Sequence, residues 1–308
     1  MKRFYERSIM LYLFLNLGFT AVAPIIIYFW GKDINHDIMI FISALTAVSS
    51  FHLLNFGQNK ATYQQLIHNH KLKPGFAKVI LTTTFMWIAG FLIPGQYTPF
   101  IFVFSYLGWP GFFGAIVMAK NSRKPESIIQ AGMILLTFIA FYLVTFHGYT
   151  VSKTAIGIVI TTLTGLSLYL YLRASKELNT KGINSRQILA IRYWLLLLLP
   201  LIVIIYKHEF GLITSVIMLK GIIIGLVTLV LPLYFGQLCI ERFGSEKFSL
   251  AMGVTPILTF ILQFFTLKTE FSQVMLALTL ALAIGMPLLI KIMINYKIQI
   301  CKPVIENK

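Results

Sequence analysis

Long apolar stretches separated by short polar connections run along almost the whole chain. Most of them have about the 17–25 residues that a helix needs to cross a hydrocarbon layer roughly 30 Å thick. We place ten such stretches at Ser8–Trp30, Asp37–Phe56, Phe76–Pro94, Tyr97–Met118, Ile128–Phe146, Ala155–Leu172, Ile188–Tyr206, Leu219–Ile240, Phe248–Leu267 and Ser272–Met293. The pattern therefore predicts an all-α integral membrane protein with ten transmembrane helices.

The composition agrees with this pattern. Of the 308 residues, 57% are hydrophobic and only 12% are charged. A soluble domain carries about 25% charged residues, so this chain has too few charges to cover a soluble surface. Its length leaves room for about ten helices with their linkers and for little else.

Lysine and arginine alternate between the two ends of the predicted helices. Of the 26 Lys and Arg residues, 21 fall on one set of linkers and ends, which includes both chain termini. The other set carries only Lys32, Lys153, Lys207, Lys220 and Lys268. Basic residues accumulate on the cytoplasmic side of a membrane. We therefore expect a multi-pass protein of the cell (inner) membrane with both termini cytoplasmic.

We therefore interpret the net charge of +16 as a signal for the orientation of the chain in the membrane. A protein that binds nucleic acid gathers its basic residues in a patch or stripe on one soluble face, whereas here they are spread over short linkers. We expect the lipid bilayer and a small-molecule solute as partners, and no nucleic acid. The pattern leaves the oligomeric state open between monomer and homodimer.

The first apolar stretch also has features of a secretory signal peptide. Basic residues precede it, and Ala21-Val22-Ala23 has the form of a cleavage site. Pro24 follows directly and disfavours cleavage, and the apolar run continues to Trp30. An uncleaved first helix is the stronger interpretation.

The two halves of the chain share a pattern. Trp109-Pro110-Gly111 leads into an apolar run that ends at Lys124-Pro125-Glu126, and Thr255-Pro256-Ile257 leads into one that ends at Lys268-Thr269-Glu270. One further apolar helix follows each run. The match pairs helices one to five, residues 1–150, with helices six to ten, residues 151–308.

The second copy is predicted to be upside down, because each copy has an odd number of helices. The linker after helix four contains Lys120, Arg123 and Lys124, whereas its counterpart after helix nine contains only Lys268. Inverted duplication is common among secondary transporters, whose two halves exchange conformations around a central site. The sequence thus predicts a five-plus-five inverted-topology repeat.

One stretch carries a family resemblance. From Phe243 to Ile290, a polar turn leads into Ser249-Leu250-Ala251-Met252, then Thr255-Pro256, a long apolar helix and Glu270. The sixth helix closes on Tyr169-Leu170-Tyr171-Leu172-Arg173, before a basic linker. With ten helices in an inverted repeat, the chain resembles EamA-type members of the drug/metabolite transporter superfamily. The resemblance implies a secondary transporter in which helices four and nine flank a central cavity.

Aromatic rings and neutral polar groups are what the helix interiors offer a solute. Tyr106, Trp109 and Phe113 share one face of helix four with Phe102. Asn16 and Gln263 carry amides, which have more hydrogen-bonding atoms to satisfy inside a membrane helix than a hydroxyl has. The predicted substrate contacts are Asn16, Tyr106, Trp109, Phe113, Thr162, Met252, Thr255 and Gln263. Helix packing is the alternative role for each of them.

Four other residues have candidate roles. Pro110 and Pro256 are predicted hinges, because each interrupts the backbone hydrogen bonds of its helix at an equivalent place in the two halves. His52 is a candidate for proton coupling. Lys220 is a candidate anion contact, and with Arg192 it could form the anion clamp that a resemblance to the phosphate-translocating branch of the superfamily would imply. Because both lie near a helix start, extension of their side chains to the membrane surface is the stronger interpretation.

These patterns favour a secondary transporter that moves a small metabolite by alternating access through a central cavity. Rings without a nearby carboxylate suit an apolar, aromatic or quaternary-ammonium solute, and the resemblance implies an amino acid, amine or related amphipathic solute, with export favoured. The alternative is an uptake carrier or exchanger for a quaternary-ammonium or anionic metabolite. A membrane-embedded enzyme or a channel is a more distant alternative, because the chain lacks clustered catalytic groups and an evident filter.

No cofactor or metal is expected. Cys239 and Cys301 both fall at the predicted cytoplasmic side and have no cluster of histidines beside them. We interpret both cysteines as structural.

Overall fold

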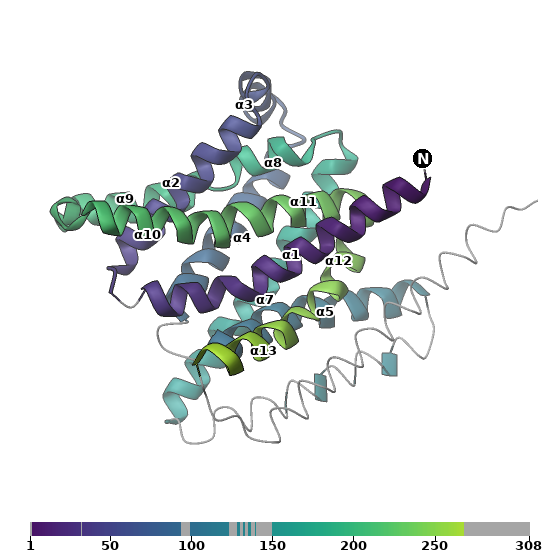
Figure 1. Ribbon diagram of the computed structural model, residues 1–308. Coiled ribbons are helices and arrows are strands. Elements are labelled where there is room, and N and C mark those ends of the chain that lie inside the picture. Colours follow the sequence, from purple (N-terminus) through teal and green to yellow (C-terminus); the bar gives the residue numbers. More distant parts are fainter. Residues whose placement is uncertain are drawn as a thin grey trace, which may run out of the picture.

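A computed structural model describes residues 2–31, 33–93, 99–122 and 150–267, together with single positions between 128 and 139. Every regular element in these ranges is a helix (Figure 1). The elements are α1 (Lys2–Gly31), α2 (His36–Leu54), α3 (Asn59–His68), α4 (Lys73–Leu92), α5 (Pro99–Ser122), α7 (Val151–Thr180), α8 (Ser185–Ile191), α9 (Trp194–Tyr206), η2 (Glu209–Leu212), α10 (Ser215–Gly225), the π-helical η3 (Leu226–Val230), α11 (Leu231–Phe243), α12 (Ser245–Met252) and α13 (Thr255–Leu267).

Six helical stretches among the described residues are long and apolar enough to cross a membrane. They are Met10–Gly31, His36–Leu54, Lys73–Leu92, Val151–Thr180, Ser185–Tyr206 and Ser215–Phe243. They correspond to the predicted helices one, two, three, six, seven and eight. The protein is therefore all-helical in its described part and embedded in a membrane.

The remaining predicted helices are covered unevenly. The fourth is α5, and the ninth is divided into α12 and α13. The tenth, and all but a few positions of the fifth, lie outside the described residues. The count of ten helices and the inverted repeat therefore stay predictions.

Glycines let the helices approach closely. Gly221 and Gly225 lie one turn apart on α10 and face α2, and a Cβ atom at Gly225 would lie 2.9 Å from the backbone of Ser43. The Ser43 hydroxyl donates a hydrogen bond across this contact to the carbonyl of Gly221, at 3.3 Å. Small residues at this spacing allow the backbones of two membrane helices to pack together.

Three of the predicted membrane helices are interrupted. The seventh turns at Arg192 and Tyr193, between α8 and α9; the eighth contains the π-helix η3; and the ninth breaks at Gly253 and Val254. Pro256 lies in the first turn of α13, where its missing N–H costs no helical hydrogen bond. α5, by contrast, runs through Pro110 without a break, so only the second of the two expected interruptions is present.

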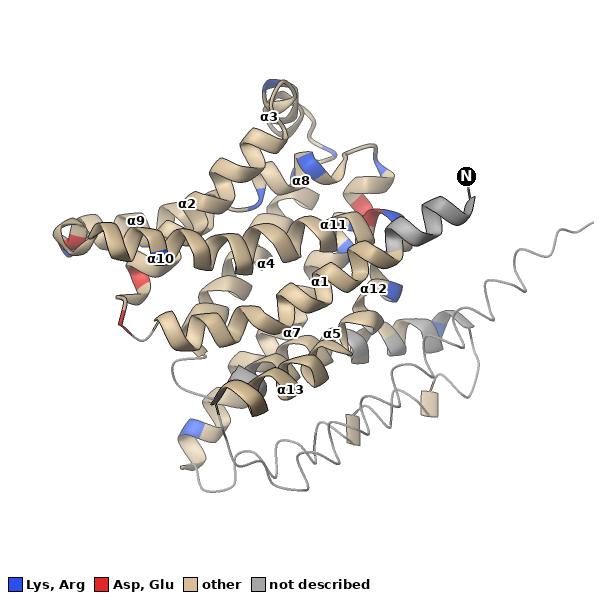
Figure 2. Ribbon diagram, viewed as in Figure 1, with Lys and Arg blue, Asp and Glu red and all other residues tan. Residues whose placement is uncertain are grey.

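Charged groups gather at the helix ends (Figure 2). Lys207 forms an ion pair with Asp37 at 2.9 Å, and Lys220 lies 4.0 Å from Asp33. The hydrogen bond with the Asp37 carboxylate raises the pKa of Lys207. These residues belong to the two linkers that the charge pattern assigns to one side of the membrane, and the structure brings those linkers together. Which side faces the cytoplasm stays a prediction.

Candidate binding pocket

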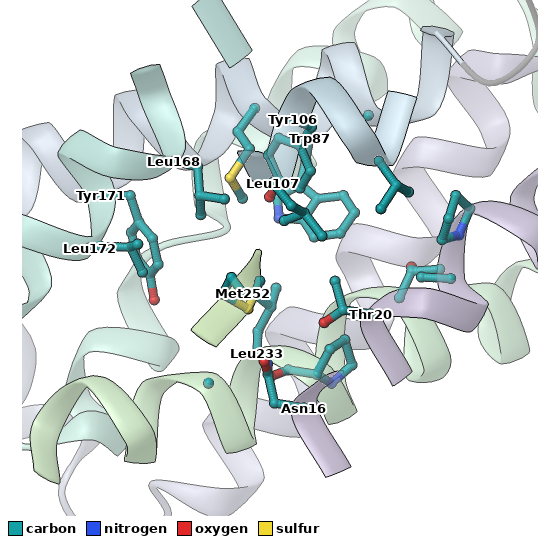
Figure 3. A pocket seen from close by; sticks show the side chains of 18 of the residues that line it. Asn16, Thr20, Trp87, Tyr106, Leu107, Leu168, Tyr171, Leu172, Leu233 and Met252 are labelled. Carbon is teal, nitrogen blue, oxygen red and sulfur yellow. The ribbon is translucent and has the colours of Figure 1, made fainter. Parts of the chain in front are cut away.

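An enclosed pocket lies between six of the helices and the π-helix. It is lined by Asn16, Thr20, Ala23, Pro24 and Ile27 of α1, Met86, Trp87 and Gly90 of α4, Val103, Tyr106 and Leu107 of α5, Leu168, Tyr171 and Leu172 of α7, Thr228 of η3, Pro232, Leu233, Gly236, Gln237 and Ile240 of α11, and Phe248 and Met252 of α12. Figure 3 shows Trp87 and Tyr106 on one side of the space and Asn16 and Leu233 on the other. Its walls are almost entirely apolar.

The pocket is closed around little space. The cavity is about 40 Å³, counted as the space open to the centre of a water-sized sphere. A region of that size holds about three water molecules. A metabolite would enter only if the surrounding helices moved apart.

Asn16 presents an unsatisfied acceptor within this wall. Its side-chain nitrogen donates to the carbonyl of Pro232 at 2.6 Å, while its Oδ1 is buried with no hydrogen-bond partner among the described residues. Gly236 makes this approach possible, because a Cβ atom there would lie 2.8 Å from Asn16 Nδ2. α1 and α11 are thereby held together beside the pocket.

Tyr171 begins a polar chain that leads away from the pocket. Its hydroxyl donates to Oε1 of Gln237, and the Gln237 amide in turn donates to Oδ1 of Asn179 at 3.4 Å. The same Tyr171 hydroxyl accepts a hydrogen bond from Nη1 of Arg192. The pocket wall is therefore directly joined to a guanidinium group.

Arg192 is completely buried, with none of its surface exposed. Its Cζ lies 4.0 Å from the ring centroid of Tyr171 and 4.8 Å from that of Tyr193, so both rings provide cation–π contacts. Two tyrosine rings thus flank this cation.

The charge of Arg192 is not balanced by the described residues. None of their carboxylates lies within 4.0 Å of it: the ion pairs found there are Lys181–Glu177, Lys207–Asp37 and Lys220–Asp33. Its Nε and Nη2 are buried without a hydrogen-bond partner in the same part of the chain. A buried ion without a counter-ion costs several kcal/mol, so this arrangement needs an explanation.

The expectation that Arg192 reaches the membrane surface is wrong. Ser185, at the start of α8, hydrogen-bonds to the carbonyl of Gln237 at 3.2 Å and to the Glu241 side chain. These contacts anchor α8 against α11. Arg192 follows seven residues later, about 10 Å further along the axis, and the intervening Ile188–Ile191 are all buried. Its side chain is enclosed by protein before it could extend to water.

Three of the predicted substrate contacts line the pocket. They are Asn16, Tyr106 and Met252. Trp109 and Phe113 instead belong to an aromatic cluster between α5 and α7. Their rings are stacked with centroids 5.8 Å apart, and Phe113 also lies 5.4 Å from Tyr169. The side chain of Trp109 covers Gly165, where an added Cβ atom would lie 2.5 Å from it.

Thr162, Thr255 and Gln263 also lie outside the pocket lining. Thr162 is half-buried on α7, and the other two are fully buried in α13. The carbonyl of Thr255 accepts a hydrogen bond from Thr259 at 3.2 Å, and Thr259 is also 3.3 Å from the carbonyl of Ala21 in α1. This part of α13 takes part in helix packing.

Neither His52 nor Lys220 lines the pocket. Nδ1 of His52 donates to the carbonyl of Val48 at 2.8 Å, so its Nε2 is left to accept from the Tyr63 hydroxyl at 2.7 Å. Tyr63 accepts from the Trp194 indole, which completes a link between α2, α3 and α9. Lys220 faces Asp33 at a helix end. Neither Pro110 nor Pro256 lines the pocket.

Sequence reasoning missed several pocket groups, chiefly Trp87, Tyr171 and Gln237. One signal in the sequence could have led to Tyr171. Arg192 lies within the apolar seventh helix, and an ionisable residue inside a membrane segment marks a functional site by default. Searching for its partners would have led to Tyr171 in the sixth helix.

Comparison with known proteins adds no further assignment: no family model matches the chain, and no curated protein is significantly similar to it.

Proposed function

We propose that this protein is a secondary transporter that moves a small solute across the membrane by alternating access through the pocket between α1, α4, α5, α7, α11 and α12. The observation that carries the proposal is the enclosed, largely apolar pocket among membrane-length helices. Ligand sites in membrane transporters lie in such central positions, between halves that move against one another.

The set of helices around the pocket supports this proposal. The repeat that the sequence predicts exchanges helix one with six, three with eight, and four with nine. The lining elements α1, α4, α5, α7, α11 and α12 belong to helices one, three, four, six, eight and nine. They form three complete pairs, as a site on the axis between two inverted halves requires.

The packing of the helices supports it in the same way. α4 of helix three packs against α7 of helix six. Replacing each helix by its partner in the repeat turns this contact into one between helices eight and one, and α11 does pack against α1. Likewise, α5 packs against α7, and α13 packs against α1. Such recurring contacts are what an inverted repeat predicts.

The interruptions of three helices supply places where the pocket could open. The π-helix η3 and Gly253–Val254 adjoin elements that line the pocket, and Arg192 at the third interruption donates a hydrogen bond to Tyr171 of the lining. None of the described lining residues is Asp, Glu or His, the side chains on which proton-coupled transporters rely. We therefore propose facilitated diffusion or exchange, with export as the direction that the family resemblance favours.

Counterflow in liposomes tests the proposal. Purified protein is reconstituted with an unlabelled solute inside, and uptake of the same labelled solute is followed for a panel of amino acids, organic acids, amines, sugars and nucleotides. We expect saturable exchange of at least one solute class. Flux that rises linearly with concentration would indicate a channel, and no exchange of any solute would refute transport.

A pair of variants ties the activity to the pocket. Leu233 lines the pocket, whereas Leu163 is exposed on the outer face of α7. Leu233→Trp fills the space and should abolish exchange, while Leu163→Trp adds the same group toward lipid and should leave exchange intact. Equal rates in the two variants would separate transport from this pocket.

A further inference from the structure

We infer that Arg192 binds the carboxylate of the transported solute, whose apolar body occupies the pocket. This inference rests on the proposed transport function and assigns its substrate class. Its basis is a completely buried cation beside the pocket that lacks a carboxylate partner in the described part of the chain.

The free groups of Arg192 have the geometry that a carboxylate requires. Nη1 is taken by the Tyr171 hydroxyl, which leaves Nε and Nη2 without partners among the described residues. These two nitrogens share the opposite edge of the planar guanidinium, and their N–H bonds point the same way. Two parallel N–H donors match the two oxygens of a carboxylate.

The charge also selects the ligand. One guanidinium balances one negative charge, so a monocarboxylate leaves the buried site neutral. A phosphate monoester carries about −1.5 to −2 at pH 7, and the described pocket wall contains no second cation to balance it. An amine or quaternary ammonium solute without a carboxylate would be repelled by Arg192.

Arg192 stands one side chain behind the pocket wall. Tyr171 contributes to that wall and also contacts the guanidinium through both its ring and its hydroxyl. Arg192 lies at the turn between α8 and α9, and irregular backbone at membrane depth occurs where it is buried in protein or lines a cavity. Separation of the helices during transport would therefore bring the free edge of Arg192 into contact with a solute.

The rest of the pocket describes the remainder of the solute. Leu107, Leu168 and Met252 offer an apolar surface to its body. The unpartnered Oδ1 of Asn16 offers an acceptor to an N–H group. An apolar α-amino acid has a carboxylate, an apolar body and such a donor.

Matched probes separate these contributions. One series is phenylalanine, 3-phenylpropanoate and 2-phenylethylamine, and the other is leucine, 4-methylpentanoate and 3-methylbutylamine. Within each series the apolar group is the same. The second compound lacks the amine and the third lacks the carboxylate. Binding to the purified full-length protein is measured by ligand-dependent thermal stabilisation and by titration calorimetry. We expect the carboxylate-bearing members of at least one series to bind and the amine without a carboxylate to give no signal.

Three variants assign the carboxylate contact. Arg192→Gln should weaken binding of the carboxylates by about 30-fold or more, because a hydrogen-bonded charge pair is lost. Arg192→Lys keeps the charge but loses the fork, and should bind them at least about 10-fold more weakly. Arg186→Gln removes an exposed arginine of the same helix α8 and should bind like the native protein.

The thermal stability of the empty protein distinguishes a binding role from a structural one. If Arg192 serves a solute, Arg192→Gln without ligand should unfold at the same temperature as the native protein or higher, because an uncompensated charge has been removed. If that variant fails to fold, carboxylate binding by Arg192→Lys decides, and native affinity there would overturn the inference.

Other outcomes would also overturn it. Tighter binding of the amine than of the carboxylate, tighter binding of phosphate esters, or the absence of binding throughout both series would each do so. One result would separate the inference from the proposed function. Saturable exchange of an uncharged solute that Arg192→Gln does not affect would support transport and refute the carboxylate site.

Discussion

Asn16 and Gly236 approach each other so closely that no side chain fits between them. The distance from Asn16 Nδ2 to a Cβ atom built on Gly236 is 2.8 Å. This contact joins α1 to α11 and holds the Asn16 amide against the carbonyl of Pro232. One wall of the pocket therefore depends on the absence of a methyl group.

Gly236→Ala should consequently destabilise the protein by about 1–3 kcal/mol, the usual cost of overpacking, and slow solute exchange. Gly18→Ala is the matched control, because Gly18 lies on α1 with open space where a Cβ atom would stand. It should unfold at or slightly above the native temperature, since alanine favours a helix. Unfolding temperatures in detergent test both, and equal values for the two variants would contradict the close contact.

Asn16→Ala should weaken solute binding by about 10-fold while reducing stability by only about 1–2 kcal/mol. The variant removes the unpaired acceptor in the pocket and one hydrogen bond to Pro232. The comparison of binding affinity with unfolding temperature is the measurement. A large loss of stability without a change in affinity would assign Asn16 to packing alone.

Trp109→Ala should show the opposite behaviour. Trp109 covers Gly165 and stacks on Phe113, so its loss leaves a cavity between α5 and α7 that costs about 3 kcal/mol or less for this partly buried ring. Solute affinity should stay within a few-fold of the native value. A Trp109→Ala protein that is stable but does not bind solute would restore the sequence-based prediction of a direct contact.

Tyr63→Phe should destabilise the link between α2, α3 and α9. Its hydroxyl joins the Trp194 indole to His52, and its removal should cost about 1–2 kcal/mol. Burial raises the pKa of Tyr63, so the folded state keeps this proton more tightly than the unfolded state. The stability of the native protein should therefore fall as pH rises above about 10, and fall less steeply in Tyr63→Phe. Unfolding measured from pH 7 to 11 tests this.

Pro110→Ala and Pro256→Ala test the hinge hypothesis. Both should slow exchange several-fold without affecting membrane insertion, because Pro110 lies within α5, which lines the pocket, and Pro256 directly follows the break between α12 and α13. Pro200→Ala is the control, since Pro200 lies within α9, a helix that neither lines the pocket nor adjoins the break between α12 and α13. Native exchange rates in both test variants would exclude bending at these positions.

Periodicity and charge predicted the helices well because both are local properties. The apolar runs located the six membrane-length stretches, and the distribution of charge predicted that the linkers of Asp37 and Lys207 share one side. Helical spacing also placed Tyr106, Trp109 and Phe113 on one face. It could not tell which of them meets the pocket, because that depends on how α5 packs against α7 and the other helices.

Arg192 was misjudged for a similar reason. Distance from the start of a helix indicates access to water only where that helix end is itself exposed. Here the contacts of Ser185 with α11 bury the whole of α8 on one side, and no local pattern reports an interaction between residues so far apart in the chain. Of the three interruptions, only that of the ninth helix was predicted, and the π-helix Leu226–Val230 was not, because such a helix has no distinct composition.

The buried arginine also constrains how the protein reaches the membrane. A helix that carries arginine at its centre resists insertion by about 2.5–3.5 kcal/mol, whereas each leucine favours it by about 0.3–0.6 kcal/mol. Five consecutive leucines, Leu195–Leu199, begin three residues after Arg192, and Leu198 and Leu199 remain exposed on the folded protein. This run offsets much of the arginine's resistance during synthesis, before Tyr171 and Tyr193 are in place. This leucine run, part of which faces lipid in the folded protein, thus allows the seventh helix to carry a charge into the bilayer.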